Sequence, residues 1–192
     1  MRLRPEEFRR LALRAHALLA DVPLRDVSGI DLPGGGGGRT LADVRQLLGA
    51  GGPSSVSPVV RFLFALRRRI GRLLGWDSHA HARPDLSYVA RLDADLSRLS
   101  LVPPGTPDGA FRILYQLPRE MVAEIRNATV HAFLVSALEE TAPGYRLHWA
   151  VYVKPISRLT PLYMAIIEPF RRWLVYPAIF RRIRRAWVQH YG

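Results

Sequence analysis

His131 is the residue whose type and surroundings point most directly to chemistry. The stretch 129–138 (TVHAFLVSAL) alternates like a β-strand, so Asn127, His131 and Phe133 fall on one side. If that side faces the interior, two polar groups enter an apolar pocket, as a small-molecule site requires. His131 would then orient a ligand oxygen or act as a general base. The alternative is a hydrogen-bonded histidine on the outer face. The sequence leaves this open because the other side of the strand is equally apolar, with Val130, Ala132, Leu134 and Leu138.

Glu168 is a second candidate, because it stands between Ile167 and Pro169 in an otherwise apolar stretch. A glutamate in such a place is buried only if it is paired. Arg171 or Arg172, one helical turn further on, is the expected partner, and a ligand-facing carboxylate is the alternative.

Three aromatic side chains could line the same pocket as these polar groups, although residues of this kind and spacing also form ordinary core. They are Tyr115, Trp149 and Tyr163. Together with Asn127, His131 and Glu168 they make up the predicted ligand site.

Motifs for a defined reaction, metal or cofactor are not found. No Ser-His-Asp or paired-carboxylate pattern predicts a mechanism, so whether the protein is an enzyme is left open. His79 and His81 have no third ligand at a suitable spacing, and the sequence contains no cysteine, so no metal site is predicted. Gly34–Gly38 lacks the lysine of a phosphate-binding loop and is predicted to be a flexible linker. No cofactor is expected.

The chain is strongly basic, with a formal net charge of +12. Of its 28 basic residues only Lys154 is a lysine, and such a bias also arises from a GC-rich genome. The charge suits nucleic acid or anionic lipid, but no helix-turn-helix, RRM or OB pattern supports nucleic-acid binding. Attachment to an anionic membrane surface through arginine-rich amphipathic helices is therefore kept as a second functional hypothesis.

The sequence predicts a cytoplasmic protein. Its most apolar run, 159–167, is far shorter than the roughly 20 residues of a membrane-spanning helix. Charged residues interrupt the N-terminal apolar stretch, which excludes a signal peptide. The lack of cysteine fits a reducing compartment.

Hydrophobic periodicity predicts one α+β domain of mixed elements. Helices are expected at 5–20, at 41–49 with Thr40 as N-cap, at 58–75 and, weakly, at 86–99. A first strand is expected at 25–32. Four further strands with short connections should form an antiparallel meander, the last of them half-buried, at 111–117, 120–127, 129–138 and 144–154.

A long C-terminal helix is predicted from Thr160, with Pro161 in its first turn. It should carry one aromatic and aliphatic stripe against the sheet and arginines on the opposite side. Pro169 and Pro177 each remove a helical hydrogen bond, so the helix should be kinked. The stripe consists of Trp173, Tyr176, Phe180, Ile183 and Trp187.

Three blocks of the sequence are similar to a known family. They are RDVSGIDLPG with RTLADVRQLL, the stretch LVPPGTPDGAFRILYQLPREMVAEIRNATVHAFL, and the segment LHWAVYVKPISRLTPLYMAIIEPFRRWLVYPAIFRRIRRAW. Through these blocks the sequence resembles a bacterial family, the domain of unknown function 2867 family. Some family members are fused behind NAD-binding epimerase-like domains, but no GxGxxG follows a strand here. Residues 1–22 look like an N-terminal helical extension of a single domain at 23–192.

The order of elements is also similar to that of the helix-grip fold of START domains, polyketide cyclases and the major birch-pollen allergen. That resemblance implies a curved antiparallel sheet around the C-terminal helix, with an apolar cavity between them. The leading hypothesis is a protein that binds a small apolar or amphipathic ligand in that cavity. A cyclase- or dehydratase-like enzyme acting there is a further alternative, and the oligomeric state is left open.

Overall fold

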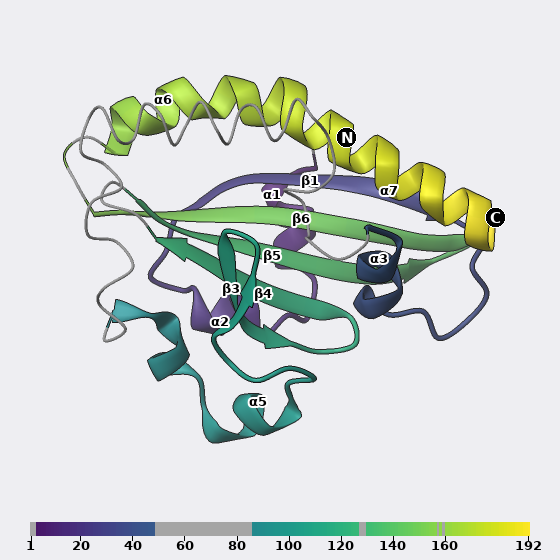
Figure 1. Ribbon diagram of the computed structural model, residues 1–192, viewed down its shortest axis with the longest axis horizontal. Helices are drawn as coiled ribbons and strands as arrows, with labels where there is room; N and C mark the ends of the chain where they lie inside the picture. The colour runs from purple at the N-terminus through teal and green to yellow at the C-terminus, as the bar shows by residue number, and fades with distance from the viewer. Residues whose placement is uncertain (1–2, 49–85, 127–129, 157, 159) are drawn as a thin grey trace.

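The computed structural model describes residues 3–48, 86–126, 130–156, 158 and 160–192. These residues form an α+β fold around a curved, fully antiparallel sheet of six strands in the order β1-β6-β5-β4-β3-β2 (Figure 1). The strands are β1 (Leu24–Pro33), β2 (Thr106–Asp108), β3 (Phe111–Gln116), β4 (Glu120–Arg126), β5 (Val130–Thr141) and β6 (Gly144–Pro155). The predicted meander is confirmed as β3 to β6, and the first predicted strand is β1.

The helices lie at the two ends of the chain and between β1 and β2. They are α1 (Pro5–Arg9), α2 (Ala15–Leu18), α3 (Leu41–Leu48), the 3₁₀ turn η3 (Tyr88–Arg91), α5 (Ala94–Leu99), α6 (Thr160–Phe170), the π-turn η4 (Arg171–Val175) and α7 (Tyr176–Tyr191). The predicted helix at 58–75 and the pair His79 and His81 lie outside the described residues.

The prediction of a single N-terminal helix at 5–20 was wrong, because the chain forms two short helices with a break between them. The carboxylate of Glu120 on β4 accepts hydrogen bonds from the backbone N–H groups of Arg14 (3.0 Å) and Ala15 (2.7 Å). A carboxylate at this place satisfies the free N–H groups of a new helix start. A tertiary contact with the sheet therefore starts the second helix here.

The C-terminal helix begins at Thr160 as predicted and runs as α6, η4 and α7 across one face of the sheet (Figure 1). The irregularity that was expected from Pro169 and Pro177 takes the form of the π-turn between them. The side chains of the C-terminal helix that face the sheet form one apolar cluster with side chains of the strands. That cluster includes Met164, Tyr176, Ile179, Phe180, Ile183 and Trp187 from the helix and Leu32, Leu134, Leu147, Trp149 and Val151 from the strands.

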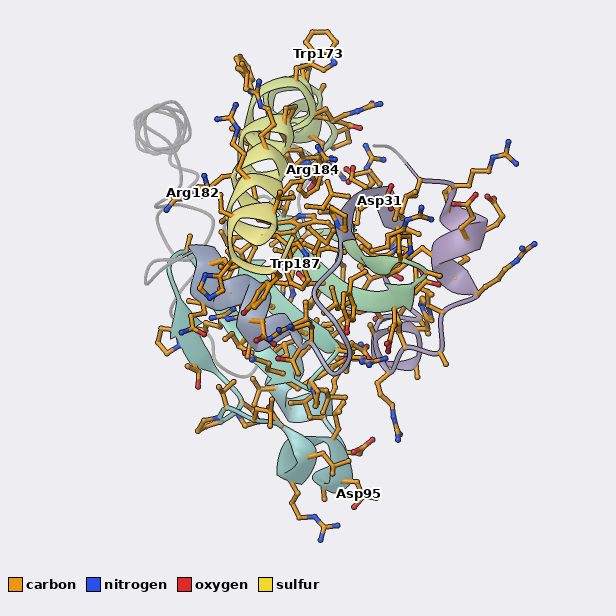
Figure 2. All side chains as sticks on the ribbon, turned by 90° about the vertical axis from the view of Figure 1, so that its right-hand side faces the viewer. Asp31, Asp95, Trp173, Arg182, Arg184 and Trp187 are labelled. Atoms are coloured by element: carbon orange, nitrogen blue, oxygen red, sulfur yellow. The ribbon has the colours of Figure 1, made fainter. Side chains whose placement is uncertain are left out.

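Trp173 was wrongly assigned to the apolar stripe of this helix. Trp173 is 78 % exposed to solvent, whereas Tyr176, Ile183 and Trp187 are buried. A π-turn accommodates one extra residue, so the side chain that reaches the sheet one turn before Tyr176 is Arg171, five positions back. Trp173 turns outward instead and projects from the surface (Figure 2).

The sheet is buried on both faces. Opposite the C-terminal helix, a second apolar cluster joins the sheet to residues 3–22 and 86–99; Phe8, Leu19, Tyr88 and Leu96 pack there against Phe133 and Tyr152. The expectation that β6 is half-buried was therefore wrong, because His148, Ala150 and Tyr152 on its second face are as buried as Leu147 and Trp149 on its first.

The start of the glycine run, predicted to be a flexible linker, is held against the end of the C-terminal helix. The N–H of Gly34 donates to Pro143 (3.0 Å), the N–H of Gly35 donates to Tyr191 (3.0 Å), and the hydroxyl of Tyr145 donates to the carbonyl of Gly36 (2.8 Å). A Cβ on Gly35 would lie 2.8 Å from the Trp187 ring, and its φ is +93°. Glycine is required there by space and by backbone conformation alike.

Candidate functional site

The predicted site residues do not converge on one place. Trp149 lies on the helix side of the sheet, with its ring 5.8 Å from that of Phe180. His131 and Tyr115 lie on the opposite face. The face of β5 that packs towards the C-terminal helix carries Val130, Ala132, Leu134 and Leu138. Asn127 and the side chain of Tyr163 lie outside what the structure describes.

A polar group that the sequence prediction missed lies between β1 and the π-turn. Asp26 on β1 is only 6 % exposed, and it follows a register shift in the pairing with β6. The guanidinium of Arg171 donates to its Oδ2, and the hydroxyl of Tyr176 donates to its Oδ1 at 3.2 Å. These three side chains form a polar trio at the edge of the apolar helix–sheet layer.

Glu168 lies at the surface beside this trio. Its carboxylate pairs with Arg172 at 3.6 Å and with Arg25 of β1 at 3.4 Å. The pairing with an arginine one turn on is therefore confirmed for Arg172, whereas Arg171 turns inward to Asp26. The two ion pairs of Glu168 connect the same strand and helix as the trio does, on its solvent side.

The electrostatics of the trio are those of a partly desolvated ion pair. Burial raises the pKa of Asp26, and the positive charge of Arg171 and the Tyr176 hydroxyl oppose that rise. Burial also raises the pKa of the Tyr176 hydroxyl. One donor of the trio is not used: Nε of Arg171 is buried and has no hydrogen-bond partner among the residues that the structure describes. A buried polar atom without a partner costs free energy, and a ligand atom could supply the missing acceptor.

On the face of the sheet opposite the C-terminal helix, His131 belongs to a buried hydrogen-bonded cluster. Its Nε2 lies 2.8 Å from Oε2 of Glu124, which also accepts from the backbone N–H of Tyr88 at 3.1 Å. Ser87 donates to the other oxygen, Oε1. Burial would raise the pKa of Glu124, but the hydrogen bonds from His131, Ser87 and Tyr88 hold it below its usual value. Because Ser87 donates to Glu124 and not to His131, the cluster does not have the order of a nucleophile with its base.

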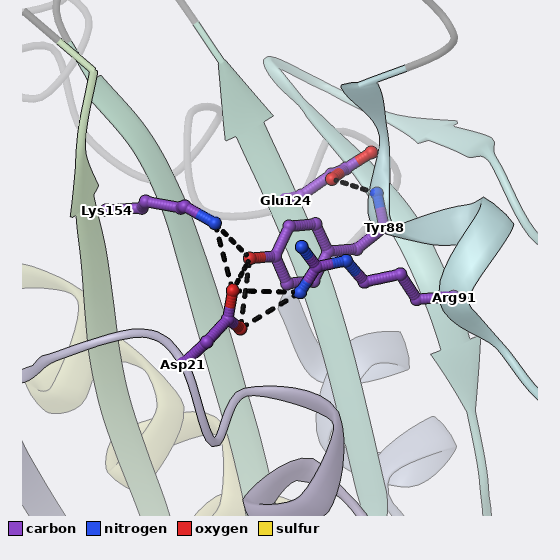
Figure 3. A network of polar contacts seen from close by, with 5 residues as sticks. All are labelled: Asp21, Tyr88, Arg91, Glu124 and Lys154. Carbon is purple, nitrogen blue, oxygen red and sulfur yellow. Dashed lines mark hydrogen bonds and ion pairs between the residues drawn. The ribbon is translucent and has the colours of Figure 1, made fainter.

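A second network adjoins this cluster through Tyr88 (Figure 3). Lys154 on β6 donates to Asp21 at 2.9 Å and to the Tyr88 hydroxyl at 3.1 Å. That hydroxyl donates to Asp21 at 3.0 Å, as does Arg91 at 2.9 Å. The hydrogen bond from Lys154 is the main reason why the pKa of Asp21 is well below its usual value. The network ties the segment before β1 and the turn η3 to the sheet.

Tyr115, another predicted site residue, takes part in a hydrogen-bonded contact that supports the fold. Its hydroxyl donates to Oε1 of Glu120 at 2.6 Å, the same oxygen that receives the N–H of Ala15. Burial raises the pKa of this hydroxyl above its usual value. Tyr115 therefore orients the carboxylate that starts α2.

Within the described residues, no group of three or more acidic or histidine side chains could hold a metal ion. No helix in the same part of the chain is long and apolar enough to cross a bilayer.

Comparison with known proteins shows to which family the chain belongs. The profile of the DUF2867 family, described as "Protein of unknown function (DUF2867)", matches residues 18–178. The chain belongs to the DUF2867 family. No curated protein matches it. The matched part of this DUF2867 protein includes Asp26, Arg171 and Tyr176, and also Asp21 and Lys154. It leaves out α1 and all of α7 beyond Ala178.

Proposed function

We propose that this DUF2867 protein is a helix-grip protein that binds a small apolar or amphipathic molecule between its sheet and its C-terminal helix. The observation that carries the proposal is the buried Nε of Arg171, beside Asp26 at the edge of an apolar layer, which no described residue meets with a hydrogen-bond acceptor. An apolar surface with a few convergent polar groups is the usual composition of a small-molecule site.

The packing of the helix indicates which end of this layer would take the ligand. Around α7, the space next to the sheet is filled by Ile183 and Trp187, both fully buried, and by Phe180 against Trp149. The end at α6 and the π-turn carries the polar trio instead, with Met164 and Ile167 among its apolar neighbours. π-turns within α-helices occur frequently at functional sites. The ligand would therefore lie near Asp26 and Arg171.

The trio also suggests what such a ligand carries. Arg171 already neutralises Asp26, so its remaining donor would favour an acceptor such as a carbonyl, hydroxyl or carboxylate oxygen. The rest of the molecule would be apolar, to match Met164 and its neighbours.

The proposal is tested with a fluorescent fatty acid, 11-(dansylamino)undecanoic acid, and with native mass spectrometry of the purified protein for a co-purified molecule. We expect saturable binding of the probe and a loss of about tenfold in affinity in Arg171→Lys. Lysine retains a positive charge for Asp26 but lacks Nε–H and the planar fork. The matched control is Arg172→Lys, whose side chain lies at the surface against Glu168. If both variants bind the probe like the parent protein and no molecule co-purifies, the proposed site is wrong.

A further inference from the structure

Three apolar side chains are exposed together at the bend of the C-terminal helix. Phe170, Trp173 and Leu174 are 44 %, 78 % and 43 % exposed. Phe170 directly precedes the π-turn, and Trp173 and Leu174 lie within it. Trp173 is the most exposed of the three and projects away from the body of the protein (Figure 2). Clustered apolar residues of this size on a surface commonly mark a place of interaction.

The local structure explains why these side chains are outside the core. The π-turn directs the side chain of Arg171 inward to Asp26. Because of the same turn, the side chain of Trp173 points outward. The sequence predicted that the whole aromatic and aliphatic stripe would pack against the sheet, with arginines on the opposite side. In the structure, most of the stripe does pack on the sheet, but its first member lies outside with Phe170 and Leu174.

The same helix is strongly basic. From Pro169 to Gly192 the sequence contains six arginines and no aspartate or glutamate. On α7, the exposed arginines are Arg181, Arg182, Arg184 and Arg185. Arg181 and Arg185 stand two positions before and two positions after the buried Ile183, which places them on the side of α7 that faces away from the sheet.

We propose that this outer face of the C-terminal helix binds the surface of an anionic bilayer. Phe170, Trp173 and Leu174 would enter the boundary between headgroups and acyl chains, where tryptophan is enriched, and the arginines would pair with lipid phosphates. A second copy of the chain is a poorer occupant, because it would bring two arginine-rich faces together. Nucleic acid would satisfy the arginines but would leave Phe170 and Leu174 without an apolar environment.

The test is co-sedimentation with vesicles of phosphatidylcholine alone and of equal parts phosphatidylcholine and phosphatidylserine, at rising sodium chloride. The protein should sediment with the anionic vesicles only, and salt should weaken the binding. Trp173→Ala should weaken it about tenfold, as expected for the loss of one large inserted side chain, and Trp173→Phe much less. Because Trp173 is exposed, both variants should fold, which circular dichroism checks. Arg181→Gln/Arg185→Gln should reduce binding about tenfold or more.

Three results would overturn the proposal. One is the absence of sedimentation with anionic vesicles. The second is sedimentation that Trp173→Ala leaves unchanged, which would reduce the contact to unspecific attraction by arginines. The third is a dimer in sedimentation velocity that Trp173→Ala dissociates, because the face would then be an interface between two copies. None of these readouts depends on Arg171, so the membrane surface and the ligand site are tested separately.

Discussion

Nε2 of His131 lies 2.8 Å from Oε2 of Glu124, and both side chains are buried between the sheet and the turn η3. The pKa of Glu124 is held below its usual value by this contact and by Ser87 and Tyr88, against the effect of burial. A carboxyl whose pKa is lower in the folded state stabilises the protein above its unfolded pKa, and that stability is lost as the pH falls through the folded pKa.

We therefore expect the free energy of unfolding to decrease as the pH is lowered from about 5 towards 3, with a shallower decrease in Glu124→Gln. Urea unfolding followed by circular dichroism at each pH measures this. Glu140→Gln is the control, because Glu140 is half exposed in a surface pair with Arg119. Equal slopes in the parent protein and Glu124→Gln would show that Glu124 contributes nothing to acid lability.

The contact between Asp26 and Arg171 should show the asymmetry of buried ion pairs. Asp26→Leu leaves the guanidinium of Arg171 largely buried without its partner and should cost about 3 kcal/mol or more of unfolding free energy. The double variant Asp26→Leu/Arg171→Leu should recover much of that loss. A parallel cycle on Arg146 and Asp31, where the aspartate side chain is 67 % exposed, should give a coupling of about 0.5 kcal/mol or less. Similar coupling energies in the two cycles would contradict the expectation that Asp26 and Arg171 interact as a buried ion pair.

Gly35 and Gly37 provide a matched pair of substitutions within one glycine run. Gly35→Ala would place a methyl group 2.8 Å from Trp187 in a left-handed backbone conformation, so we expect a loss of about 2 kcal/mol or more. Gly37→Ala meets nothing within 4 Å and should be neutral or slightly stabilising. Thermal melting of both variants decides this. Equal melting temperatures would mean that the loop does not pack on Trp187.

The C-terminal helix should be indispensable for folding. Trp187 is fully buried and donates its indole N–H to Pro33 at 3.0 Å, so Trp187→Ala should cost about 3–5 kcal/mol. Trp173→Ala should change stability by about 0.5 kcal/mol or less, because that side chain is exposed. Deletion of the residues after Arg172 should prevent folding. A truncated protein that remains in solution and melts cooperatively would refute this.

The sequence could predict the strands β3 to β6 because each has six residues or more, is rich in β-branched and aromatic residues and is joined to the next by a short connection. It could predict the start of the C-terminal helix because Thr160 and Pro161 are strong signals. It could not predict β2, which has three residues, one of them Pro107, in a turn-rich stretch. Nor could it tell the two faces of β5 apart. Both faces are buried, so both are apolar, and the usual contrast between a core face and a solvent face is missing.

The candidate site was harder to predict for a similar reason. Arg171 and Trp173 are two residues apart, and regular α-helical spacing assigns Trp173 to the core and Arg171 to solvent. One π-turn exchanges the two positions, and its location between Pro169 and Pro177 is not encoded in any periodic pattern. Asp26 was overlooked because its partner, Arg171, is 145 residues away in the sequence.

The two-sided burial of the sheet has a consequence for the boundaries of the family. The matched residues 18–178 end before Ile179, Phe180, Ile183 and Trp187 and begin after Phe8 and Ala15, all of which are buried. The unit defined by sequence similarity is thus smaller than the unit that folds. A chain trimmed to the matched residues would lose buried side chains from both faces of its sheet at once.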